Sequence, residues 1–93
     1  MSEVIQNQEL ERFELVEDGD IAGFSEYKIV GNEIIFTHTE ILGYDRERGL
    51  GSRLVREELD QVREHTDYRV VAQCPFVAHW LAGHPDYQDL LSR

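Results

Sequence analysis

The chain is poor in cysteine and has no long hydrophobic run. Its single cysteine, Cys74, cannot form an internal disulfide. No apolar stretch approaches the ~20 residues that a membrane-spanning helix needs. The chain also lacks the basic segment followed by an apolar one that marks a secretory signal. We therefore expect a cytoplasmic protein that has no membrane partner.

Positive charge is scarce as well. Nine Lys and Arg residues stand against 19 Asp and Glu residues, which gives a formal net charge of −10. Nucleic acids and anionic membranes bind basic surfaces, so this balance argues against both as partners. No set of His, Cys, Asp and Glu residues has the spacing of metal ligands, so the sequence predicts no metal site.

The length of 93 residues and the mixed composition indicate one small folded domain over residues 1–93, with residues 1–9 frayed or at an edge. Alternating apolar and polar residues predict strands over 10–16, 21–30 and 33–42. Gly19 and Gly31 fit the turns between them. The third strand is long and has Thr-His-Thr-Glu at its centre, which suggests two segments or a bend.

A helix and a further strand follow. The helix is predicted over 49–64 by an apolar stripe at helical spacing: Leu50, Leu54, Val55, Leu59 and Val62. Residues 68–73 read as a compact strand suited to burial on both faces. A strand, a helix and a strand in succession imply a parallel crossover. Pro75 is suited to the first position of a second helix, and Gly83 to its C-cap.

The segment between the third strand and the long helix has the form Arg46-x-x-Gly49-x-Gly51. Glycines let the backbone approach a ligand closely. The first N–H groups of a helix are unpaired and its dipole is positive there, so the segment suits a phosphate. The spacing is neither that of a P-loop nor that of a dinucleotide-binding Gly-x-Gly-x-x-Gly, whose third glycine would fall on Leu54. An ordinary glycine-bearing turn remains the alternative.

This segment resembles the Gln/Arg-x-x-Gly-x-Gly/Ala motif of the GNAT superfamily of N-acetyltransferases. Three further motifs stand in order and at matching intervals between about Glu9 and Leu91, and together they resemble a small stand-alone subfamily: Thr37-His38-Thr39-Glu40-Ile41, Cys74-Pro75-Phe76-Val77 and His84-Pro85-Asp86-Tyr87. The resemblance implies an α+β fold with a mixed, mostly antiparallel sheet, one parallel splayed strand pair and flanking helices.

The resemblance also implies a function. The protein would be an N-acetyltransferase that transfers an acetyl group from acetyl-coenzyme A to an amine on a protein or a small molecule, as a monomer or a homodimer. Two alternatives stay open. One is a coenzyme A-binding module with little or no catalysis, acting in sensing or protein interaction. The other is an interaction domain that binds no coenzyme.

Three segments are expected to contact the coenzyme. Backbone N–H groups around the end of the third strand would bind the acetyl and pantetheine carbonyls: Glu40, Ile41 and Leu42. The glycine segment would bind the pyrophosphate: Arg46, Glu47, Arg48, Gly49, Leu50, Gly51 and Ser52. Residues of the second helix and the position before it complete the expected set: Cys74, Phe76, His79 and Trp80.

The catalytic candidates are Cys74, Glu40 and His38. Cys74 would accept the acyl group or line the thioester pocket, and inert packing is the alternative. Glu40 would act as a general base through water, with His38 as the second candidate; exposed strand residues without a role are the alternative for both. Three departures from the subfamily pattern matter, and one is that Leu42 and Gly43 replace a Pro-rich bend. Glu47 replaces a glycine and is expected to point outward, and Trp80 replaces a tyrosine whose proton the indole cannot supply.

Overall fold

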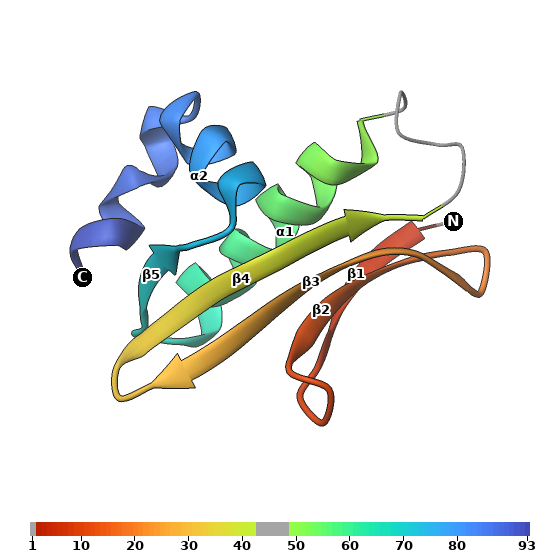
Figure 1. The fold of residues 1–93 in the computed structure, drawn as a ribbon, viewed down its shortest axis with the longest axis horizontal. Coiled ribbons are helices and arrows are strands. Elements are labelled where there is room, and N and C mark those ends of the chain that lie inside the picture. The colour runs from red at the N-terminus through yellow and green to blue at the C-terminus, as the bar shows by residue number, and fades with distance from the viewer. Residues whose placement is uncertain (1, 43–48) are drawn as a thin grey trace.

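The structure is a computed structural model, and it describes residues 2–42 and 49–93. A five-stranded sheet runs in the order β1-β2-β3-β4-β5. The helices lie on one side of this sheet, as Figure 1 shows. The longest of them, α1 (Leu50–His65), packs against β1, β2, β3 and β4. The apolar face of the sheet is therefore covered on the helical side.

The first four strands are antiparallel neighbours, and their bounds are β1 (Ser2–Asn7), β2 (Arg12–Glu17), β3 (Asp20–Val30) and β4 (Glu33–Ile41). The three strands expected from the alternation are confirmed, and β1 adds an edge strand from the segment that the sequence left as frayed or at an edge. Gly19 and Gly31 have φ values of 87° and 60°. Both turns therefore use the left-handed backbone conformation that glycine adopts without strain.

The second half of the chain follows the predicted crossover. After α1 comes β5 (Arg69–Ala72), which pairs parallel to β4 from Glu33↔Arg69 to Phe36↔Ala72. Helix α2 (Pro75–Ala82) starts at Pro75 and has its C-cap at Gly83, and a 3₁₀ helix, η2 (Pro85–Ser92), completes the chain. The mostly antiparallel sheet with one parallel pair and flanking helices confirms the expected fold class.

One expectation for β5 was wrong. Residues 68–73 looked suited to burial on both faces, but only Val70 is buried, while Val71 and Ala72 are half-buried. The reason is the position of β5 at the edge of the sheet. An edge strand has a neighbouring strand on one side only, so a run of apolar residues does not imply full enclosure.

Strand β4 contains a bulge, which is the form that the expected bend takes. Glu26 pairs with His38 and Tyr27 pairs with Phe36, so Thr37 has no partner residue in β3. The Thr37 hydroxyl donates to the Glu26 carbonyl at 3.3 Å. An extra residue reverses the alternation of side chains along a strand. Before the bulge the even-numbered Ile34 and Phe36 point into the core, and after it the odd-numbered Thr39 and Ile41 do.

The parallel pair β4–β5 separates at Phe36. The N–H groups of Gln73 and Cys74 both donate to the Phe36 carbonyl, at 3.0 and 2.9 Å, and the chain then turns into α2. On the other side, the Leu42 N–H donates to the Ala22 carbonyl at 2.8 Å. Because N–H directions alternate along a strand, the N–H groups of Thr39 and Ile41 point to the edge that β5 has left.

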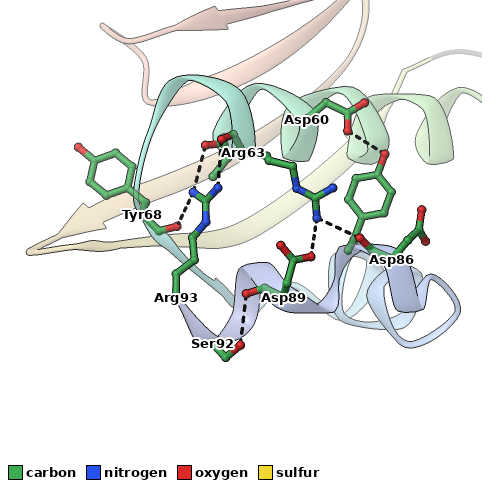
Figure 2. A network of polar contacts seen from close by, with 9 residues as sticks. Asp60, Arg63, Tyr68, Asp86, Asp89, Ser92 and Arg93 are labelled. Atoms are coloured by element: carbon green, nitrogen blue, oxygen red, sulfur yellow. Dashed lines mark hydrogen bonds and ion pairs between the residues drawn. The ribbon is translucent and has the colours of Figure 1, made fainter.

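Figure 2 shows a polar network that joins η2 to the C-terminal end of α1. The Arg93 guanidinium donates to the carbonyls of Arg63, Thr66 and Tyr68 at 3.0, 2.7 and 3.3 Å. The last carbonyls of a helix lack intrahelical partners and carry the negative end of its dipole, so a cation is favourable there. The Tyr87 hydroxyl donates to Asp60 of α1 at 2.7 Å. Together these bonds hold the terminal 3₁₀ helix on α1.

Two neighbouring leucines of η2 provide a test of this packing. Leu90 is fully buried, whereas Leu91 is 37% exposed. We expect Leu90→Ala to lower the free energy of unfolding by about 2–5 kcal/mol, because it leaves a cavity. Leu91→Ala should cost less than about 1 kcal/mol. Urea denaturation of both variants measures the difference, and equal losses would contradict the docking of η2 on the core.

Candidate functional site

A pocket of about 510 Å³ opens between the end of β4 and the start of α1. Its walls come from three elements, and the lining residues are Thr39, Glu40 and Ile41 of β4, Gly49, Gly51 and Ser52 at the start of α1, and Phe76 of α2. It lies where β5 no longer covers the edge of β4. The separation of the two parallel strands therefore provides both the space and the free strand edge.

The start of α1 is open to an anion. Gly49 is the N-cap residue, with a left-handed φ of 72°, and the first turn of the helix contains no acidic residue. Both Gly49 and Gly51 line the pocket, as does Ser52. The unpaired N–H groups of a first helical turn and the positive end of its dipole favour a phosphate at such a position.

Gly51 has a second role, in packing. A Cβ atom at this position would lie 2.7 Å from Cζ of Phe76, closer than side chains tolerate. A side chain at position 51 would therefore displace the Phe76 ring, which lines the same pocket. Leu50, which was expected to contact the coenzyme, is buried in the core.

Cys74 lies beside β4 in the structure. Its thiol is buried and donates to the Thr39 hydroxyl at 3.4 Å, and it is the N-cap residue of α2. Thr39 lines the pocket and Cys74 does not. The fold therefore brings the expected nucleophile to the site through Thr39, which the sequence reasoning did not assign to the site.

Glu40 and His38 form a pair with each other on the exposed side of β4. Their side chains are 46% and 52% exposed, and Nε2 of His38 lies 3.0 Å from Oε1 of Glu40. Glu40 also lines the pocket. The role of either residue as a base stays a prediction.

Trp80 contacts the pocket indirectly, through a hydrogen bond to the lining residue Ser52. Its Nε1–H donates to the Ser52 hydroxyl at 2.8 Å, and its ring stacks on His84 with centroids 3.7 Å apart. Neither Trp80 nor His79, which is exposed on α2, lines the pocket.

The N–H of Leu42 is already bonded to Ala22, so the N–H groups turned to the pocket edge are those of Thr39 and Ile41. Arg46, Glu47 and Arg48, with the expected outward orientation of Glu47, lie outside the described residues.

A buried carboxyl group is the main feature that sequence reasoning missed. Glu58 of α1 has no exposed surface, and its Oε2 accepts a hydrogen bond from the Ser25 hydroxyl at 3.1 Å. Its Oε1 has no partner among the described residues. The sequence contains a signal for this burial. Glu58 stands four residues after Leu54 and four before Val62, so helical spacing places it on the apolar stripe.

Burial raises the pKa of Glu58 well above its ordinary value. The hydrogen bond from Ser25 acts in the opposite direction, and repulsion from the charge that Cys74 can carry adds to the rise. Burial favours the protonated form of a carboxyl group because the charged form loses its hydration.

Residues 2–42 and 49–93 contain neither a metal-binding cluster nor a membrane-spanning helix. None of the groupings of His, Cys, Asp and Glu side chains there is suited to hold a metal ion. None of the helices in that part of the chain has the length and apolar character to cross a bilayer.

Comparison with models of known protein families gave a match. A family model described as GCN5-related N-acetyl-transferase matches residues 12–90. The matched range starts at the first residue of β2 and ends within η2, so it includes all of the pocket residues. No curated protein matches the chain.

The raised pKa of Glu58 predicts a pH-dependent stability. Between the unfolded pKa of about 4.3 and the higher folded pKa, the folded state binds more protons than the unfolded state. The free energy of unfolding should therefore fall as pH rises through this window, by up to about 1.4 kcal/mol per pH unit. Glu58→Gln removes the titration, so the stability of the wild type relative to this variant should decline with pH in urea denaturation. A difference that is constant with pH would contradict the assignment.

Proposed function

The chain belongs to the GCN5-related N-acetyltransferase family, and we propose that it transfers the acetyl group of acetyl-coenzyme A to an amine. Membership supports acyl transfer as the general activity, while the coenzyme and the amine acceptor are part of the proposal. The observation that carries it is the pocket between the separated strands β4 and β5 and the start of α1. An acyl donor with a phosphate at one end and an amide-bearing arm needs an open helix start for the phosphate and a free strand edge for the arm.

The residues of the pocket fit such a coenzyme. Gly49, Gly51 and Ser52 present the open start of α1, which suits a pyrophosphate. The N–H groups of Thr39 and Ile41 face the free edge of β4, which suits the carbonyls of an extended arm. When bound, acetyl-coenzyme A supplies the activated acetyl group as a thioester. The chain would hold it by backbone donors at both ends.

The amine must lose a proton for acyl transfer to proceed. Glu40 is the carboxylate in the pocket wall, and its hydrogen bond with His38 connects it to a second group that can hold a proton. We assign Glu40 the role of general base, with His38 as its partner. The acceptor amine reaches this pair from the exposed side of β4, where both side chains lie.

A second candidate function is a coenzyme A-binding module with little catalysis. Trp80 favours this reading, because its indole N–H is bonded to Ser52 and does not titrate usefully. No proton donor for the leaving thiol is therefore provided from this position of α2. Binding without turnover would be the result that supports the module.

Acetyl-coenzyme A should stabilise the protein. Ligand at 100 times its dissociation constant adds ~2.7 kcal/mol, and 1 kcal/mol shifts the melting temperature of a domain this size by about 4–8 °C. We therefore expect the melting temperature to rise by about 10 °C or more. Gly49→Asp should abolish the rise by placing a carboxylate at the anion site, and Gly49→Asn is the matched neutral control, since both residues tolerate a positive φ. If the melting temperature does not rise at millimolar ligand, the proposal is refuted. An equal rise in both variants would mean that the phosphate binds at another site.

Turnover distinguishes the enzyme from the binding module. We expect acetyl transfer to amines in a coupled thiol-release assay, and Glu40→Gln should lower kcat by about 10²-fold or more, as removal of a general base does. Glu33→Gln, at the opposite end of β4 and paired with Arg69, should leave kcat unchanged. A coenzyme-dependent rise in melting temperature without turnover on protein, peptide or small amines would favour the module instead.

A further inference from the structure

Four side chains from four segments form a continuous line of hydrogen bonds through the core. The Cys74 thiol donates to the Thr39 hydroxyl at 3.4 Å, the Thr39 and Ser25 hydroxyl oxygens lie 3.3 Å apart, and Ser25 donates to Oε2 of Glu58 at 3.1 Å. Cys74, Ser25 and Glu58 are 4%, 0% and 0% exposed, and Thr39 is half-buried in the wall of the pocket. The line connects the wall of the pocket to the inner face of α1.

The protons along this line point in one direction. A hydroxyl group has one proton to donate. When Glu58 is ionised, its Oε2 can only accept, so Ser25 donates to it and accepts from Thr39, and Thr39 in turn accepts from the thiol of Cys74. Every donor therefore points toward the carboxyl group, which is the arrangement that allows a proton to move by successive short transfers.

We propose that, once this pair has lost one of its two protons, Cys74 and Glu58 share the remaining one through Thr39 and Ser25, and that the shared proton rests on Glu58 so that Cys74 is the thiolate. The S–H bond of Cys74 breaks and an O–H bond forms on Glu58, while each hydroxyl between them gives up one proton and receives another. No electrons are gained or lost. One negative charge is present before and after, and it moves from the Glu58 carboxylate to the Cys74 sulfur.

The surroundings of Glu58 make this charge movement favourable. The elements packed against α1 are β1, β2, β3, β4 and α2, and their buried inward side chains are Val4, Phe13, Leu15, Ser25, Tyr27, Ile34, Phe36, Val77, Trp80 and Leu81. Tyr27 is the titratable member of this set, Cys74 stands just before α2, and none of the set is a cation. A carboxylate at Glu58 is thus without a compensating charge there, and its Oε1 is without a hydrogen bond among the described residues.

Cys74 stands at the start of a helix. Cys74 is the N-cap residue of α2, where the positive end of the helix dipole stabilises a thiolate. After Thr39 has passed its proton to Ser25 and received the proton of Cys74, its hydroxyl donates a hydrogen bond back to the sulfur. Burial also keeps the pKa of the Glu58 carboxyl high, which favours the proton on oxygen at that end of the line.

Proton sharing is a property of the free protein, while its use in acyl transfer rests on the proposed function. The thiolate is the nucleophilic form of cysteine, and Thr39 belongs both to the line and to the pocket wall. Glu58 acts on Cys74 through two hydroxyl groups, so it is a positioning residue. It sets the protonation state of the sulfur without touching the pocket.

The single cysteine allows a direct test. Protein labelled with [3-¹³C]cysteine gives one Cβ resonance, whose shift follows the ionisation of Cys74 with pH in the absence of coenzyme. Two coupled groups titrate in two steps that belong to the pair. We therefore expect two inflections for the wild type and one for Glu58→Gln. Glu57→Gln is the matched control, because its carboxylate pairs with Arg53 on the exposed side of the same helix, and it should retain both inflections.

A second variant separates the line of hydroxyls from a through-space effect. Thr39→Val removes the central hydroxyl and leaves both titrating groups in place, so the lower inflection of the Cys74 resonance should lose its amplitude. Full amplitude in Thr39→Val, a single inflection in the wild type, or coincident curves for the wild type and Glu58→Gln would each overturn the proposal. None of these readouts depends on acetyl transfer, so failure of the proposed function leaves the test intact.

Discussion

The extra residue at Thr37 is the constraint on which the site depends. Without the bulge, β4 would continue to point its even-numbered side chains into the core, and His38 and Glu40 would lie beneath α1. With it, Thr39 and Ile41 point inward, and their N–H groups face the edge from which β5 has separated. A single additional residue in one strand thus exposes a row of backbone donors and turns two titratable side chains toward solvent.

The same reversal produces the polar line in the core. Thr39 reaches Cys74 and Ser25 because it lies on the inner face, and Ser25 reaches Glu58 because α1 crosses β3 at that point. A buried carboxyl group with one oxygen that has no partner among the described residues lowers stability relative to an apolar residue. A small core tolerates such a cost poorly, so a group of this kind indicates a role other than packing.

Much of the fold could be predicted from the chain because its signals are local. The helical stripe from Leu50 to Val62, the turns at Gly19 and Gly31, and Pro75 at the start of α2 each act within a few residues. The parallel crossover followed from the order of elements. The burial of β5 was predicted wrongly, because its place at the edge of the sheet is set by strand order and not by Val70 and its neighbours.

Residue patterns alone predict the elements, their order and most of the residues that line the pocket, but they missed Thr39 and the buried Glu58. The tertiary structure decided which of those residues meet. It placed Glu40 with His38 on one side of β4 and Thr39 with Cys74 on the other, and it connected the second pair, through Ser25, to a buried Glu58 that is distant in sequence. The physical reason is that a bulge and a helix crossing depend on strand register and packing between distant segments, which local residue patterns do not encode.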